Sequence, residues 1–203
     1  MKQFWWRIWF SAILFGSLAA CGLLRSPSSD PTRGPISEYN MSLADTGYPE
    51  LYQEALDFMR VGRYAEAEEL YLHLLDLEPR NANAAIGLGA SLLLQDKLER
   101  SLEAYQRAVE FAPQSLQAHI GMGSAAYQLG QLEMASQQYR LALDLDDQNM
   151  DALWGLVITL EASGRRREAV EFLERIINIE PQSAYAEAAL EKLDAFSSDT
   201  NTD

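Results

Sequence analysis

The sequence contains few of the residues that enzymes and metal sites depend on. Its 203 residues include a single cysteine, Cys21, so no disulfide can form within a monomer and packing must stabilise the fold. The two histidines, His73 and His119, lack the spacing of metal ligands, and we interpret both as structural residues. No set of residues has the arrangement of a catalytic site. The sequence therefore predicts neither an enzyme nor a metal-binding protein.

Basic residues are also scarce. The chain has 16 Lys and Arg against 30 Asp and Glu, a net charge of −14, and residues 1–20 contribute two bases and no acid. Such a chain lacks the cationic face that phosphate backbones require, so we expect no nucleic-acid partner. The acids of one expected helix, Glu66, Glu68 and Glu69, are interpreted as a solvated outer face or, alternatively, a docking surface for a basic partner. The arginines at 165–167 are expected in a helix–helix turn and are interpreted as a solubilising loop.

The apolar run near the start of the chain is short. Residues 8–18 form eleven largely apolar positions after Lys2 and Arg7, which is too few to span a bilayer. A charged start, a short apolar segment and a small-residue site predict a secretory signal peptide over residues 1–20. The following tetrapeptide, Leu18-Ala19-Ala20-Cys21, resembles the bacterial lipobox. That resemblance implies cleavage before Cys21, diacylglycerol on its sulfur and an acyl chain such as palmitate on the new N-terminus, with no other cofactor.

The cysteine is well suited to this modification, because a thiolate is the strongest nucleophile among side chains. Gly22 follows Cys21, which resembles the pattern of Gram-negative lipoproteins sent to the outer membrane. We therefore expect a lipid-anchored protein on the periplasmic side of that membrane. An ordinary cleaved signal, or an uncleaved N-terminal anchor helix, is the alternative. Residues 21–47, rich in proline and serine, are expected to form a flexible tether behind the lipid.

The rest of the sequence repeats every 34 residues. Tyrosine recurs at 71, 105 and 139, with leucine at 173, and glycine recurs at 62, 130 and 164, with aspartate at 96. A fixed period of this length indicates a stack of similar units rather than one closed core. Each unit has two stretches with apolar residues at helical spacing around a short break, so it predicts two antiparallel helices joined by a tight turn. The paired glycines Gly87/Gly89 and Gly121/Gly123 fall inside helices, where they favour close packing rather than phosphate binding.

This pattern resembles the tetratricopeptide repeat, whose signature places Leu-Gly, aromatic, alanine and proline positions at these offsets. The resemblance implies an all-α, right-handed solenoid of four helix pairs, at residues 48–81, 82–115, 116–149 and 150–183. Residues 184–196 are expected to form a capping helix and residues 197–203 a disordered tail. Three positions depart from the signature: Asp147 replaces a proline, Val157 a small residue and His119 a large apolar residue.

In tetratricopeptide-repeat arrays the first helices line a concave face, and the resemblance implies such a groove here. The residues carried onto its exposed positions are largely apolar, which is typical of an interaction site. The alternative is that they pack within the array or against the capping helix. The groove lacks the Lys and Asn set of chaperone-binding repeats, so the expected ligand is an amphipathic helix or an extended apolar peptide. The expected groove residues are Tyr52, Met59, Ile86, Leu93, Ile120, Tyr127, Trp154 and Ile158.

These features together predict a scaffold that binds proteins. The lipobox, the short array and the Gly-Leu-Gly positions are similar to repeat lipoproteins of the tight-adherence (Flp) pilus apparatus and to pilotins. The resemblance implies a role in assembling a pilus or secretion system. An adaptor that recruits peptidoglycan hydrolases or a periplasmic protease is the alternative. The sequence does not name the partner or the oligomeric state.

Overall fold

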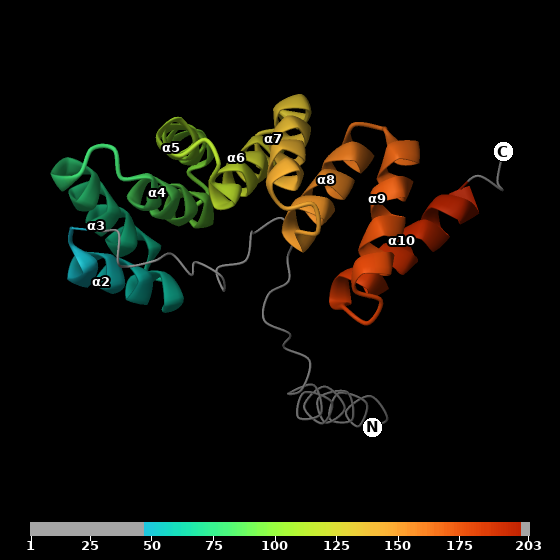
Figure 1. Ribbon diagram of the computed structural model, residues 1–203, viewed down its shortest axis with the longest axis horizontal. Coiled ribbons are helices and arrows are strands. Elements are labelled where there is room, and N and C mark those ends of the chain that lie inside the picture. Colours follow the sequence, from blue (N-terminus) through green and yellow to red (C-terminus); the bar gives the residue numbers. More distant parts are fainter. Residues whose placement is uncertain (1–46, 200–203) are drawn as a thin grey trace, which may run out of the picture. The chain divides into compact units, whose positions relative to one another are not determined.

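The structure is a computed structural model in which residues 47–199 are described (Figure 1). The predicted signal peptide, Cys21 and the tether up to residue 46 lie outside the described residues, as do residues 200–203. Every regular element between residues 47 and 199 is an α-helix. In chain order these are α2 (Pro49–Arg60), α3 (Tyr64–Leu77), α4 (Ala82–Leu94), α5 (Leu98–Phe111), α6 (Leu116–Gln128), α7 (Leu132–Leu145), α8 (Met150–Ala162), α9 (Arg166–Ile179) and α10 (Ala184–Asp199).

The helices stack as successive pairs, α2 with α3 through α8 with α9, and this confirms the predicted all-α solenoid. Each helix packs against the next one in the chain, and the first helices of neighbouring pairs also meet, α4 with α6 and α6 with α8. The last helix, α10, packs on α9 and ends the described part of the stack (Figure 1). It continues to Asp199, so the expectation of a disordered tail from residue 197 is wrong for residues 197–199. Ser197 and Ser198 stay helical, each donating its hydroxyl to a carbonyl of the preceding turn.

The turn inside each pair requires one residue with left-handed backbone. Gly62, Gly130 and Gly164 have φ of 76°, 72° and 75°, and glycine adopts this region without a steric penalty. Asp96 occupies the equivalent place in the second pair with φ of 62°. Aspartate tolerates this conformation better than most residues but still carries a Cβ. The 34-residue glycine period therefore reflects a backbone requirement, which one pair meets with a less suitable residue.

The first helices α4, α6 and α8 begin at a capping residue that also recurs every 34 positions. Asn81, Ser115 and Asn149 each accept a hydrogen bond from the backbone N–H three residues later, at 2.9, 3.3 and 3.0 Å. Ser183 does the same for α10, at 3.2 Å. Such caps satisfy one of the N–H groups that a helix leaves open at its start. They fix where α4, α6 and α8 begin, and α10 starts like the first helix of a further pair.

Helix glycines make room for the tyrosines of the second helices. Tyr105 of α5 lies between α4 and α6, where a Cβ added to Gly89 or Gly121 would lie 2.8 or 2.0 Å from its ring. Tyr139 lies in the same way between Gly123 and Gly155. The packing role predicted for these glycines is therefore confirmed. Each tyrosine ring joins two first helices and carries the hydrophobic core from one pair to the next.

Candidate partner-binding surface

The predicted groove residues lie on the first helices, but most of them are not exposed. Ile120 and Tyr127 of α6 are half-buried and remain the accessible members. The other six have exposed fractions of 9% or less, so the expectation that they are open to solvent is wrong. These six are Tyr52, Met59, Ile86, Leu93, Trp154 and Ile158.

Packing between neighbouring helices explains this burial. Tyr52 of α2 meets the ring of Tyr71 edge-on at 5.7 Å between centroids, and its hydroxyl donates to the carbonyl of Asn83 at 3.4 Å. Helices α4 and α8 are buried on nearly every side between their neighbours. Large side chains at inner positions therefore fill the space between first helices. The six buried residues therefore follow the alternative interpretation, in which they pack within the array. Whether any of them contacts a partner stays a prediction.

Trp154 lies close to two residues of the capping helix α10. Its ring lies 6.0 Å from that of Tyr185 on α10, and the ammonium of Lys192 lies 5.9 Å from its centroid. Tyr185 donates its hydroxyl to Asp151, and Lys192 pairs with Glu161 at 2.5 Å. The capping helix is thus held against the inner side of α8 by aromatic and ionic contacts.

The indole N–H of Trp154 has no acceptor. Among the described residues, it is the only buried side-chain polar atom without a hydrogen-bond partner. Buried donors are nearly always satisfied, because an unmade hydrogen bond costs about 1–3 kcal/mol. The inner wall therefore contains a buried, unsatisfied donor on an indole that lies beside the ring of Tyr185, a feature that sequence reasoning could not detect.

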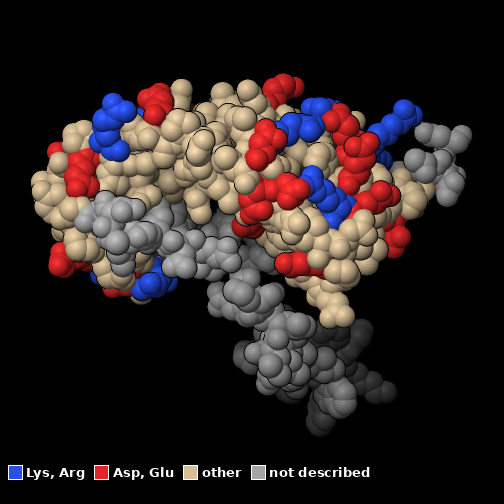
Figure 2. All heavy atoms as spheres, viewed as in Figure 1, with Lys and Arg blue, Asp and Glu red and all other residues tan. Residues whose placement is uncertain are grey.

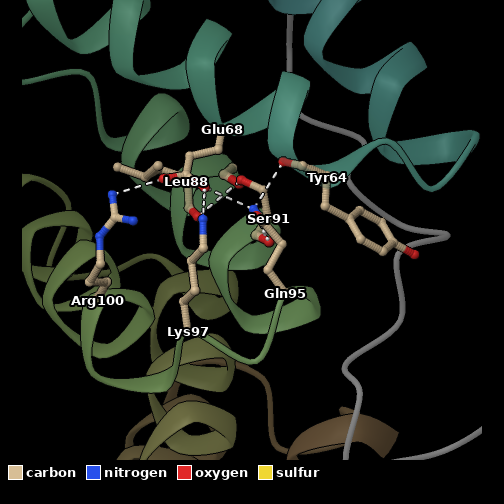
Figure 3. A network of polar contacts seen from close by, with 8 residues as sticks. Tyr64, Glu68, Leu88, Ser91, Gln95, Lys97 and Arg100 are labelled. Atoms are coloured by element: carbon tan, nitrogen blue, oxygen red, sulfur yellow. Dashed lines mark hydrogen bonds and ion pairs between the residues drawn. The ribbon is translucent and has the colours of Figure 1, made fainter.

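A polar cluster joins the first two pairs (Figure 3). Glu68 of α3 accepts hydrogen bonds from Lys97 at 2.7 Å and Gln95 at 2.9 Å, and pairs with Arg100 at 2.8 Å. It is 7% exposed, so the expectation that it belongs to a solvated face is wrong. Burial alone raises the pKa of its carboxyl, but the hydrogen bonds from Lys97, Gln95 and Arg100 outweigh this effect and lower it. This cluster connects elements rather than forming a reactive site.

His119 occupies a structural position, as predicted. His119 is buried, with Nδ1 2.8 Å from the side-chain oxygen of Gln138 and Nε2 3.0 Å from the carbonyl of Pro113. His73 is exposed on α3. Within residues 47–199 no three metal-binding side chains come together, and no helix there is long and apolar enough to cross a membrane.

Comparison with known proteins identifies the repeat. Models described as tetratricopeptide repeat match residues 52–115 and 126–193, well over half of the chain. The chain belongs to the tetratricopeptide-repeat family. Its members generally act as scaffolds for protein–protein interaction, and the matches include no catalytic family. A search of curated proteins found no significant match.

Solved tetratricopeptide-repeat structures share the fold. The structure is similar to MamA from Desulfovibrio magneticus RS-1, with TM-score 0.62 and 24% identity over 67% of this chain and 76% of that one. It is also similar to TTC0263, a thermophilic TPR protein in Thermus thermophilus, with TM-score 0.61 and 22% identity over 70% and 81%. The first TPR of Spaghetti (RPAP3), bound to the HSP90 peptide SRMEEVD, matches with TM-score 0.55 and 23% identity over 56% and 90%. At these identities the comparisons show the fold alone.

Proposed function

We propose that this protein is a lipid-anchored scaffold on the periplasmic side of the outer membrane, which binds a peptide segment of an envelope assembly along its inner wall. The lipobox ending at Cys21 supports the anchor, because stable membrane attachment takes more than one acyl chain and the modified cysteine carries several. The similarity to Flp pilus lipoproteins supports a pilus or secretion system as the assembly served.

The unsatisfied indole N–H of Trp154 is the observation that carries the binding proposal. A peptide main chain offers carbonyl oxygens, which are the natural acceptors for such a donor. Tyr127 and Ile120 of the neighbouring α6 are half-buried and pack against the core cluster that contains Trp154. A related fold holds a peptide in the RPAP3 structure. Because Nε1 is buried in the free protein, binding of a peptide carbonyl there requires neighbouring side chains to move.

The test removes the donor while keeping most of the ring. Partners are captured from native membranes with the lipidated protein and identified by mass spectrometry, comparing the wild type with Trp154→Phe. We expect Trp154→Phe to lower recovery of the specific partner severalfold with little change in melting temperature, since the donor contributes no hydrogen bond in the free protein. Tyr64→Phe removes one polar atom from an aromatic residue of α3 and serves as the matched control. Equal recovery with Trp154→Phe would contradict the assignment of the inner wall.

The anchor is tested separately through Cys21. We expect Cys21→Ser to accumulate unprocessed or soluble protein, and globomycin to have the same effect on the wild type. Membrane association that survives both treatments would show that the lipid assignment is wrong. Because this readout is fractionation rather than partner capture, the two halves of the proposal can fail independently.

A further inference from the structure

A second candidate site lies at the start of α9 and the end of α10. Its floor is apolar, formed by Val170 of α9 with Leu193 and Phe196 of α10, and its rim carries the arginines at 165–167. Phe196 is 7% exposed, whereas the three arginines are exposed. They are the only adjacent basic residues in the sequence. Figure 2 shows Lys and Arg atoms near this end of the array, with acidic side chains beside them.

Contacts within the site hold part of the rim in place and leave it positive. The guanidinium of Arg166 lies 4.7 Å from the centroid of the Phe196 ring, a cation–π arrangement that orders both groups. Arg165 binds both oxygens of Glu168 at 2.7 Å, and Arg140 of α7 reaches the same carboxylate at 3.0 Å. Glu168 is the only acid lining the pocket, and its carboxylate thus pairs with two arginines.

Arg167 supplies the free positive charge. Within residues 47–199 it forms no ion pair or hydrogen bond through its side chain, and it is exposed beside the apolar floor. A guanidinium presents a planar fork of donors that matches a carboxylate in two parallel hydrogen bonds. An apolar floor below such a group suits a ligand with a large apolar side chain next to an acid.

We propose that this pocket docks an acidic peptide segment, whose central aromatic or aliphatic side chain fills the floor while a neighbouring carboxylate pairs with Arg167. Charge complementarity selects this ligand. The chain has a net charge of −14 and repels acidic segments at long range, so the arginines at 165–167 mark the place where such a segment can approach. The same net charge opposes an anionic membrane surface, which we therefore reject as the occupant.

The experiment measures binding of a labelled hexapeptide with a central phenylalanine between aspartates, by fluorescence anisotropy with the purified full-length protein. We expect saturable binding that weakens as salt rises, because exposed charges are screened. Replacing the phenylalanine by alanine, or the aspartates by lysines, should each weaken binding by about tenfold or more.

Protein variants locate the peptide in the pocket. Arg167→Glu should weaken binding by about tenfold or more, while Arg60→Glu, a matched reversal of an exposed arginine at the end of α2, should stay within about twofold. Melting curves establish that both variants are folded, and Val170→Lys, which places a cation in the floor, provides a second probe of the pocket. Equal effects of Arg167→Glu and Arg60→Glu would overturn the proposal. So would an alanine peptide that binds as tightly as the phenylalanine peptide, or binding of phosphatidylglycerol vesicles in place of the peptide.

Discussion

Along the array, the size of the side chain at each tyrosine position is matched to the size of the side chains at the neighbouring glycine positions. An added Cβ at Gly121 would lie 2.0 Å from the ring of Tyr105, so these two positions fit only as a pair. In the fourth repeat the tyrosine position holds Leu173, and the glycine positions hold Val157 and Ala189. All three are fully buried in the same core cluster. A smaller residue on the second helix thus accompanies larger residues on the first helices, as close packing requires.

Gly121→Ala should therefore destabilise the protein by about 1–3 kcal/mol through overpacking, although alanine favours helix more than glycine does. Urea unfolding followed by circular dichroism measures the change. The matched control is Gly123→Ala on the same helix, where the nearest ring atom would be 3.0 Å away, so the loss should be smaller. In a Tyr105→Leu background, which copies the fourth repeat, Gly121→Ala should become neutral or stabilising. An equal loss in both backgrounds would show that the ring contact is not the cause.

Asp96 is the one non-glycine residue with left-handed backbone among the residues that the structure describes. Asp96→Gly should raise the free energy of unfolding by about 0.5 kcal/mol, because relief of the steric cost slightly exceeds the entropy lost by glycine. Asp96→Ala should lower it, since alanine has the Cβ without the polar group that eases this conformation. Thermal melting of the three proteins tests the order, and a melting temperature for Asp96→Ala above that of the wild type would contradict it.

At the scale of elements, Glu68 connects α3 with α5 and the turn before it (Figure 3). The pKa of its carboxyl is lower in the folded chain than its ordinary value of 4.5. The charged form therefore stabilises the fold at pH values above 4.5, and this contribution disappears as pH falls through the lower folded pKa. We predict that Glu68→Gln reduces stability at pH 7 and that its difference from the wild type shrinks below pH 4.5.

Glu69→Gln provides the control for this prediction. Glu69 lies next to Glu68 on α3 but is exposed, so its substitution should leave stability nearly unchanged across the same pH range. Urea unfolding at several pH values compares the three proteins. A constant difference between Glu68→Gln and the wild type from neutral to acid pH would mean that the lost contacts do not depend on the charge.

Across the whole molecule, the 34-residue period of the sequence predicted the helix pairs, because the residues that fix the turns and the helix contacts repeat with the same period. The turn glycines and the helix tyrosines both follow the 34-residue spacing. Even α7, followed by Asp147 rather than proline, ends at the position equivalent to the ends of α3, α5 and α9. Burial was harder to predict, because it depends on neighbours far along the chain. Glu68 and Glu69 are adjacent and chemically identical, yet the partners that bury Glu68 lie about 30 residues later in the chain. Ile86 is likewise buried, although its position in the repeat predicted an exposed groove residue.

The stacked pairs also predict how the molecule unfolds. Its buried residues form two clusters, one spanning residues 52–125 and one spanning residues 126–196, with Leu102 and Met134 packed against both. In such an array each unit contacts only its neighbours, so stability lost at one end need not reach the other.

Leu173→Ala, at a fully buried position, should cost about 2–5 kcal/mol and raise amide exchange in α8–α10 far more than in α2–α5. Leu74→Ala, equally buried in α3, should give the reverse pattern. Hydrogen exchange with mass spectrometry compares the two, and a uniform increase along the chain in either variant would indicate a single cooperative unit instead.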